Sequence, residues 1–145
     1  LSVRTALPVD FDQWLPLWQG YHRFYEREIA DAITHSTWAR FFDAYEPVHA
    51  LVAEREGVLF GLVHYLFHRN TSTIAPVCYM QDLFTAEKAR GQGIGRALID
   101  AVCERARAAG SPRVYWMTHE TNRTAQTLYD KMAERSGFIQ YRKAL

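Results

Sequence analysis

The run Arg90-Gly91-Gln92-Gly93-Ile94-Gly95-Arg96 is the feature that most constrains what this chain can fold into. It lies between a strand-like stretch, residues 78–85, and residues 94–109, where apolar side chains recur at helical spacing. Glycines at the start of a helix leave backbone N–H groups free and let a ligand approach the main chain closely. The helix dipole adds partial positive charge at the same place. The run therefore predicts a phosphate-binding loop.

Two well-known glycine-rich motifs do not fit this loop. A dinucleotide fingerprint requires G-x-G-x-x-G, whereas the glycines here stand at positions 91, 93 and 95. A Walker loop ends in Gly-Lys-Ser/Thr, and no such sequence follows. Taken alone, the glycines fit a flexible turn before a helix as well as they fit a phosphate site.

The pattern along the whole chain predicts one α/β domain, residues 1–145, with a mixed central sheet flanked by helices. Helices are expected at 10–25, 36–45 and 94–109, with a fourth capped by Asn122. Strands are expected at 3–6, 48–55, 58–69, 78–85, 113–119 and 138–143, with a hairpin turn at Glu56-Gly57. Strands that first follow one another and later alternate with helices are typical of such a sheet.

Composition and charge exclude several classes of protein. A hydrophobic content of 48% suits a packed core, and no stretch has the length of a membrane span. A net charge of +1 gives no general attraction to nucleic acid. Cys78 and Cys103 lack C-x-x-C spacing, and His119-Glu120 lacks the cysteine pair of a zinc site. We expect a cytoplasmic protein with reduced thiols and without a nucleic-acid, membrane or metal partner.

The loop and three further segments resemble a known family. Arg90-x-x-Gly93-x-Gly95 resembles the pyrophosphate motif, Arg or Gln-x-x-Gly-x-Gly or Ala, of the GNAT N-acetyltransferase superfamily. The other segments are similar to that family's fourth strand, a later helix and the part beyond it: Gln81-Asp82-Leu83-Phe84-Thr85, Asn122-x-x-Ala125-x-x-Leu128-Tyr129 and Ser136-Gly137-Phe138. Within the superfamily they most resemble the branch that acetylates polyamines, other small amines or histone tails.

The resemblance implies the GNAT fold and acetyl-CoA as the cofactor. The pyrophosphate would lie on the loop, and the pantetheine arm would pair like a strand beside the end of the fourth strand. Asn122 is explained almost as well by helix capping alone. The cofactor-binding residues that the resemblance implies are Leu83, Phe84, Thr85, Arg90, Gly91, Gln92, Gly93, Ile94, Gly95, Arg96, Asn122 and Tyr129.

Tyr129 matches the family tyrosine that gives a proton to the departing thiolate. A phenol has an unperturbed pKa near ~10, so it is protonated at neutral pH and can act as an acid. The competing interpretation is an ordinary core tyrosine on a buried helix face. A backbone N–H near Leu83 is the expected donor to the oxyanion.

The sequence leaves the general base open. Relatives often carry Glu just before the Asp of the fourth strand, but this chain has Gln81, whose amide cannot accept a proton. Strand alternation places the next residue, Asp82, on the opposite face. Asp82 and Glu120 are the catalytic candidates, with His64 and His119 as further ones, and the proton can also leave through water.

The expected substrate contacts are Tyr25, Glu28 and Gln81. Acidic and aromatic side chains between residues 21 and 31 suit a cationic amine, because carboxylates attract it and aromatic rings hold ammonium groups. A solvated helix end, with Arg23 and Arg27 neutralising the acids, explains the same residues equally simply.

The sequence thus predicts an acetyl-CoA-dependent N-acetyltransferase that acts on a primary amine of a small polyamine-like or amino-acid-like molecule by direct attack. A homodimer or higher homo-oligomer is expected by analogy with the fold. The alternatives are a lysine acetyltransferase acting on proteins or histone tails, a non-catalytic acyl-CoA sensor, and a phosphate-binding scaffold for another nucleotide.

Overall fold

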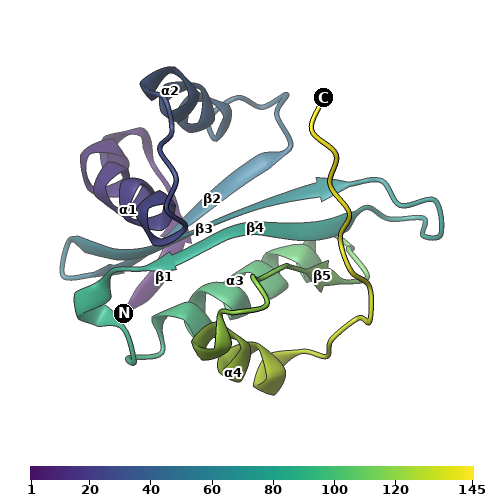
Figure 1. The fold of residues 1–145 in the computed structure, drawn as a ribbon. Coiled ribbons are helices and arrows are strands. Elements are labelled where there is room, and N and C mark those ends of the chain that lie inside the picture. Colours follow the sequence, from purple (N-terminus) through teal and green to yellow (C-terminus); the bar gives the residue numbers. More distant parts are fainter.

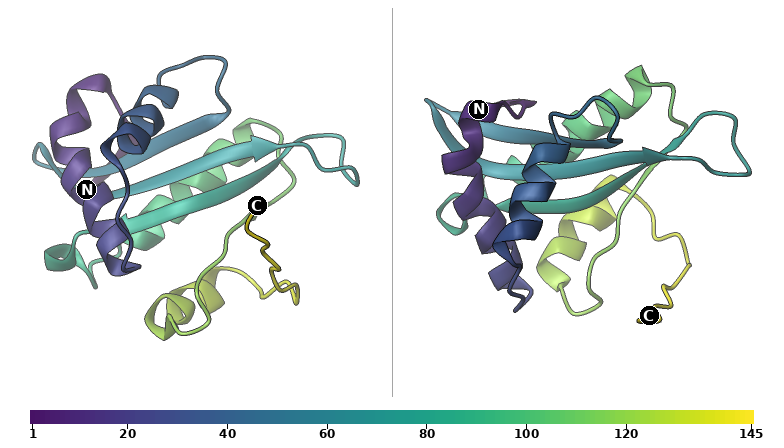
Figure 2. Two further views of the ribbon diagram at one scale, coloured as in Figure 1. Left: turned by 45° about the horizontal axis from the view of Figure 1, so that its top comes forward. Right: turned by 90° about the horizontal axis from the view of Figure 1, so that it is seen from above.

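The computed structural model describes residues 1–145 and places a five-stranded sheet between two pairs of helices (Figure 1). The strands, in their order across the sheet, are β1 (Ser2–Thr5), β2 (Val48–Arg55), β3 (Val58–His68), β4 (Val77–Thr85) and β5 (Val114–Tyr115). The helices are α1 (Phe11–Phe24), α2 (Asp31–Arg40), α3 (Ile94–Ala108) and α4 (Arg123–Met132), with short 3-10 turns η1 (Pro8–Asp10) and η2 (Glu87–Ala89). Helices α1 and α2 cover one face of the sheet and α3 and α4 the other (Figure 2).

The first four strands run antiparallel, and β5 returns parallel to β4 after α3. The turn between β2 and β3 has Glu56 at φ 50° and Gly57 at φ 78°. Two successive positive φ angles suit the right-handed twist of a tight hairpin. The mixed α/β fold and this hairpin confirm the expectations from sequence.

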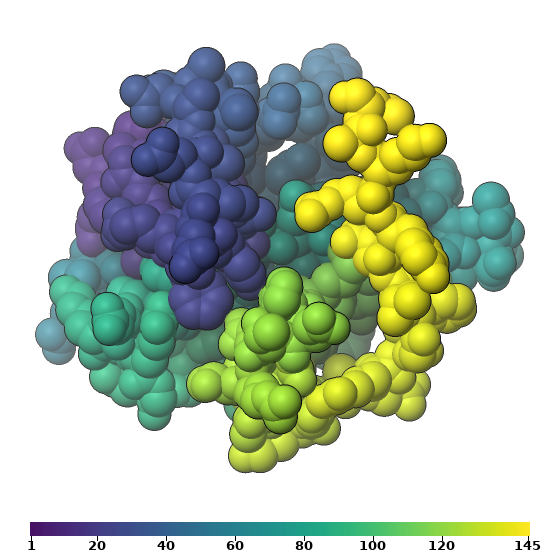
Figure 3. Space-filling view, viewed as in Figure 1, coloured from purple at the N-terminus to yellow at the C-terminus, as the bar shows by residue number.

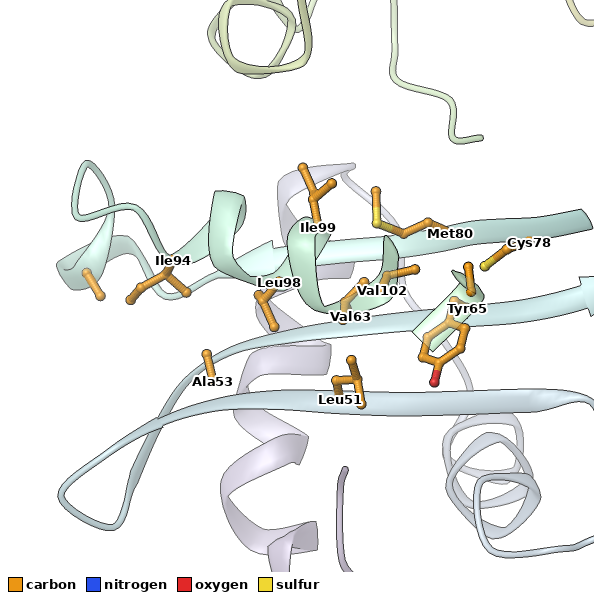
Figure 4. Close-up of a cluster of buried hydrophobic side chains, with 12 residues drawn as sticks. Leu51, Ala53, Val63, Tyr65, Cys78, Met80, Ile94, Leu98, Ile99 and Val102 are labelled. Atoms are coloured by element: carbon orange, nitrogen blue, oxygen red, sulfur yellow. The ribbon is translucent and has the colours of Figure 1, made fainter. Parts of the chain in front are cut away.

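Each face of the sheet has its own hydrophobic core. Along β3, Val63 and Tyr65 face α3, while Leu62 faces α1. Figure 4 shows the α3 core, whose buried members are Leu51, Ala53, Val63, Tyr65, Cys78, Met80, Ala89, Ile94, Leu98, Ile99, Val102 and Ala106. The α1 core consists of Ala6, Trp14, Leu17, Trp18, Tyr21, Ala50, Val52, Leu59 and Leu62.

A β-bulge at Gln81 interrupts β4. Tyr65 pairs with Met80 and His64 pairs with Asp82, so Gln81 is an extra residue on its strand. Met80 packs in the α3 core, whereas Asp82 contacts His64 on the α1 side. The regular alternation that the sequence predicts along this strand therefore shifts by one residue at the bulge.

The strand expected at 113–119 is much shorter in the structure. β5 pairs with β4 only through Val114 with Cys78 and Tyr115 with Tyr79. The bulge follows two residues later on β4, and a bulge bends its strand and ends regular pairing. Beyond Tyr115 the chain leaves the sheet and continues toward α4 (Figure 1).

The second helix also differs from the expected range 36–45, because α2 begins at Asp31 and ends at Arg40. Thr34 is buried, and its hydroxyl accepts a hydrogen bond of 3.1 Å from the indole N–H of Trp18. Packing against α1 thus holds the first turn of this helix, which lies before the range that the sequence pattern predicts as helical.

The final strand predicted at 138–143 is wrong for the single chain. The last helix ends at Met132, and no strand follows it. Phe138 and Tyr141 are 91% and 89% exposed, and the segment stands apart from the sheet (Figure 2, right). The alternating pattern lacks a neighbouring strand to pair with, since β5 ends at Tyr115.

None of the helices combines the length and the apolar character that crossing a bilayer requires. The cytoplasmic location and the homo-oligomer stay predictions.

Gly61 provides a test of the packing between β3 and α3. A Cβ atom at this position would lie 3.0 Å from Ile94 and Leu98 side-chain atoms and 3.1 Å from the Phe84 carbonyl oxygen. We expect Gly61→Ala to lower the free energy of unfolding by about 1–3 kcal/mol in urea titrations, because the backbone of β4 cannot move aside cheaply.

Gly95→Ala is the matched control, since the nearest atom to its added Cβ lies at 3.6 Å. In a helix this change gains up to about 1 kcal/mol. Equal stabilities for the two variants would contradict the close approach of β3 to α3.

Candidate active site

The loop between β4 and α3 presents unpaired backbone amides. Gly91 and Gly93 have φ angles of 78° and 81°, which glycine adopts without strain. A Cβ atom at either position would meet nothing within 4 Å, so the space above the loop is open. The N–H groups of residues 91–96 make no hydrogen bond within the protein. Successive free amides at a helix N-terminus form an anion-binding concavity, which fits a pyrophosphate.

The side chain of Arg90, the first residue of the loop motif, packs against aromatic rings. Arg90 places its guanidinium over the rings of Phe24 and Phe84, at 5.7 and 5.5 Å, and its Nε donates to the Thr85 carbonyl at 3.3 Å. Arg90 is therefore held against aromatic rings, while the loop backbone provides the anion site.

Arg55, at the end of β2, donates a hydrogen bond of 3.0 Å to the side chain of Gln92. Sequence reasoning missed this cation beside the loop, because only the sheet brings residue 55 next to residue 92. Ile94 is buried in the core and offers its backbone alone, whereas Arg96 is exposed.

The edge of β4 beside the loop has no partner strand. β4 pairs with β5 only at Cys78 and Tyr79, so residues 80–85 have a free edge facing away from β3. Free backbone donors and acceptors on a strand edge pair readily with an extended, amide-containing molecule. This edge includes Leu83, Phe84 and Thr85, as the resemblance implied.

An opening between β4 and β5 brings the two helical layers together. It contains a small cavity of about 20 Å³, room for about one water molecule. The cavity is lined by Tyr21 of α1, Tyr25 at the C-terminal end of α1, Met80, Gln81 and Leu83 of β4, Trp116 and Met117 after β5, and Tyr129 of α4. In the space-filling view, the segment after α1 lies against the segment before α4 (Figure 3).

Tyr129 lies on the α4 side of this cavity. Its ring packs edge-on against Trp116, with centroids 5.5 Å apart. Burial, and then the proximity of Tyr25, raise the pKa of Tyr129 to about 12. The hydroxyl is therefore kept in its protonated form, as a proton donor requires.

Tyr25 faces Tyr129 from the other helical layer. Burial raises the pKa of Tyr25, and the side chain of Asn122 partly opposes this shift. Asn122 also caps α4, because its Oδ1 accepts from the N–H of Ala125 at 3.3 Å. The predicted cap is confirmed, and the same residue lies beside the cavity.

A buried chain of hydrogen bonds holds Asp82. The indole N–H of Trp14 donates to Nε2 of His64 at 3.1 Å, so Nδ1 of that neutral imidazole carries its proton. His64 Nδ1 then donates to Oδ2 of Asp82 at 2.9 Å. His64 is only 2% exposed and is surrounded by aromatic rings of α1 and by Phe41.

The second oxygen of Asp82, Oδ1, forms no hydrogen bond of 3.5 Å or less, although the Tyr21 hydroxyl lies close enough to interact with this carboxylate, and the side chain is 12% exposed. The pKa of Tyr21 is raised strongly, first by burial and then by the negative charge of Asp82. Asp82 thus combines a fixed orientation with a free oxygen on the α1 side of the opening.

The structure brings several of the predicted site residues together and leaves others apart. Tyr25, Gln81, Leu83 and Tyr129 line one cavity, and the charge of Asp82 reaches it through Tyr21. Asp82, Glu28 and Glu120 are not among the residues that line it.

Both glutamates are in exposed loops. Glu28 follows α1, and Glu120 lies in the connection before α4, where its carbonyl accepts from Gln126. His119 bonds to the neighbouring Thr121 hydroxyl at 2.7 Å. Their roles as base or substrate contact find no support in this arrangement.

Sequence reasoning missed Tyr21, Trp116 and Met117 as cavity residues. The spacing of Trp14, Trp18 and Tyr21 indicates a buried helix face, but it does not indicate which strand residues that face meets. No group of three or more His, Cys, Asp or Glu side chains is arranged to hold a metal ion.

A larger groove of about 610 Å³ lies outside the opening, between α1 and the end of β4. It is lined by Asp12, Gln13, Pro16, Leu17, Gly20, Arg23, Phe24, Leu59, Phe84, Ala86, Glu87, Lys88 and Arg90. Sequence reasoning did not anticipate it.

Comparison with known proteins identifies the fold and the family. The family described as "Acetyltransferase (GNAT) family" matches residues 11–133. The D-amino-acid N-acetyltransferase HPA3 of Saccharomyces cerevisiae is 35% identical over 145 residues, covering 99% of this chain and 90% of the yeast protein.

Two solved structures share the fold. The ribosomal-protein-alanine N-acetyltransferase of Brucella melitensis biovar Abortus 2308 superposes with a TM-score of 0.81, at 19% identity and full coverage of both chains. AAC(6')-Iy, in complex with the bisubstrate analog CoA-S-monomethyl-acetylneamine, gives a TM-score of 0.82 at 19% identity, covering 99% of this chain and 98% of the other. With the amide-lined loop and the free edge of β4, these matches lead to one conclusion: the chain belongs to the GNAT acetyltransferase family and is an N-acetyltransferase that uses acetyl-CoA.

Proposed function

We propose that this enzyme transfers the acetyl group to the primary amine of a small molecule, by direct attack of the amine on the thioester. The observation that carries the proposal is the convergence of side chains at the opening between β4 and β5. A proton donor, Tyr129, and a carboxylate, Asp82, approach this opening from opposite faces of the sheet. Acetyl-CoA supplies the acetyl group as a thioester when it is bound.

Asp82 is our candidate for the group that takes the proton of the acceptor ammonium, directly or through one water. Its Oδ1 is free, and the hydrogen bond from His64 fixes its orientation. A positioned carboxylate of this kind can act as a general base. Gln81 lines the cavity but cannot accept a proton, so it is suited only to orienting the acceptor.

Protonation of the leaving sulfur and stabilisation of the oxyanion are assigned to groups on α4 and on the edge of β4. The Tyr129 hydroxyl gives its proton to the leaving sulfur, and a backbone N–H near Leu83 on the free edge of β4 stabilises the developing oxyanion. The acceptor nitrogen loses two protons on the way from ammonium to amide. Asp82 takes the first before the C–N bond forms, and the second, lost as the C–S bond breaks, replaces the proton that Tyr129 gives to the sulfur, so that one proton is released overall.

Two observations support a small acceptor. The opening is lined mainly by aromatic and apolar side chains, with acidic Asp82 behind Tyr21, which suits a compact amine. The yeast relative, at 35% identity, is named for acetylating D-amino acids. We therefore place amino acids first among the small amines.

Release of free thiol from acetyl-CoA, measured against amino acids, polyamines, aminoglycosides and a histone-tail peptide, tests this proposal. We expect turnover with a small-amine class and none with the peptide. Turnover with the peptide alone would replace the proposal with protein acetylation.

We expect Tyr129→Phe to lower kcat by about 100-fold or more, since general acid catalysis contributes about 10²–10⁴-fold. The dissociation constant for CoA, measured by calorimetry, should stay within about twofold, because the lost hydroxyl acts on the leaving sulfur. An unchanged kcat would remove Tyr129 from the mechanism.

The pH dependence provides a second check on Tyr129. Its raised pKa keeps the hydroxyl protonated up to about pH 12, so its ability to donate a proton is lost only above that pH. We expect kcat/KM to rise with pH as the acceptor amine deprotonates, with no fall up to about pH 10. A descending limb below about pH 10 that disappears in Tyr129→Phe would contradict the assignment.

The two predicted carboxylates are distinguished by amide substitutions. We expect Asp82→Asn to lower kcat/KM by about 100-fold, because the amide cannot accept the proton. Glu120→Gln should change it by less than about twofold, since Glu120 is exposed in the connection before α4 and no hydrogen bond fixes its carboxylate, whereas Asp82 is held by His64. The opposite result, in steady-state kinetics with the same amine, would move the base to Glu120.

A further inference from the structure

Arg27 lies directly after α1, at the mouth of the opening. Its guanidinium carbon is 4.9 Å from the ring centroid of Tyr25 and 5.6 Å from that of Tyr21. Both rings line the cavity. Arg27 is an exposed residue whose guanidinium also interacts with the Tyr21 hydroxyl, which leaves most of its five N–H donors for a molecule that enters the opening.

The positive charge of Arg27 is not neutralised within the protein. The ion pairs of the structure join Arg4 to Asp10 and Glu54, His64 to Asp82, and Arg135 to Asp130. Neither Glu26 nor Glu28, its neighbours in sequence, pairs with it. The alternative raised by the sequence, in which Arg27 neutralises these acids, is thus not what the structure shows.

The turn that ends α1 fixes the position of Arg27. The N–H of Arg27 donates to the carbonyl of His22, and the N–H of Glu26 donates to that of Arg23, both at 2.9 Å. This pair of bonds is a Schellman motif, which usually has glycine where Glu26 stands. Glu26 has a φ of 55°, a left-handed conformation that a non-glycine residue adopts only when its surroundings enforce it.

An opposite charge, that of Asp82, acts on the same two tyrosines. The charge of Asp82 raises the pKa of Tyr21, while Arg27 acts on the same hydroxyl in the opposite direction. The carboxylate of Asp82 and the guanidinium of Arg27, neither of which is neutralised by an opposite formal charge other than through His64, thus both lie within interaction range of the Tyr21 hydroxyl. This arrangement complements a molecule that carries an ammonium and a carboxylate close together.

A third polar group in this region has no partner. His22 is 8% exposed, and neither of its ring nitrogens makes a hydrogen bond. Burial, and then the charge of Arg27, lower the pKa of His22, while Asp82 acts in the opposite direction. An unsatisfied buried imidazole within range of both charges is unusual in a native protein, and it is consistent with a polar ligand nearby.

We propose that Arg27 determines acceptor specificity by binding the carboxylate of an α-amino acid, while Asp82 receives its ammonium group. The inference rests on the proposed function and names the substrate class of that same site. A guanidinium held against aromatic rings is already partly ordered, so less side-chain entropy is lost when its N–H fork binds a carboxylate.

The test pairs each acceptor with the amine that lacks only its carboxylate, for example D-phenylalanine with 2-phenylethylamine. Thiol release is measured for the wild-type enzyme and for Arg27→Gln, Arg27→Lys and Arg23→Gln. We expect Arg27→Gln to lower kcat/KM for the amino acids by about 10- to 100-fold, mainly through KM. The paired amines should change by less than about twofold, and Arg27→Lys should recover part of the loss.

Arg23→Gln is the matched control, because Arg23 is an exposed cation in the last turn of α1, close to Arg27 in sequence, and it lines the separate groove. We expect it to leave both members of each pair unaffected. Equal losses for amino acids and paired amines in Arg27→Gln, or no loss for either, would overturn the inference.

The wild-type enzyme separates this inference from the proposed function. Turnover of amines without turnover of any amino acid would overturn the role of Arg27 and leave small-amine acetylation standing. Absence of thiol release with every small amine would overturn the proposed function itself.

Discussion

The separation of β4 from β5 is the constraint on which the site depends. The two strands share only the pairs Cys78–Val114 and Tyr79–Tyr115 before the bulge at Gln81 turns β4 away. This separation leaves one strand edge free for an extended cofactor arm and allows side chains of α1 and α4 to meet through the sheet. A continuous ladder of hydrogen bonds between β4 and β5 would cover this edge and close the opening between the two strands. The bulge thus links the topology of the sheet to the chemistry that we assign to it.

The α1 core contributes to the same site through the chain from Trp14 to His64 to Asp82. Burying a polar chain is costly unless each member is satisfied, and here every donor has an acceptor. Only the outer oxygen of Asp82 remains without a partner. The residue that we assign as the base is therefore held by the folding core itself, on a strand, where positions are better defined than on a loop.

Local patterns were predictable from the sequence, and contacts between distant segments were not. The loop at residues 90–96, the helix after it and the Asn122 cap depend on nearby residues, and all are present as expected. The length of β5 depends on a bulge in another strand, so the alternation at 113–119 was misleading. His64 and Asp82 come from different strands, so their pairing depends on the register of the sheet. The position of Arg27 over two tyrosines depends on a turn in which Glu26 is left-handed. Neither has a local signature.

A crystal structure of the enzyme with bound CoA tests the central claim most directly. We predict that the pyrophosphate lies on the free amides of residues 91–96 and that the pantetheine arm pairs with the edge of β4. The sulfur should then lie in the opening, within about 3–4 Å of the Tyr129 hydroxyl. A sulfur outside the opening, or a β5 strand paired with β4 beyond Tyr115, would contradict this account.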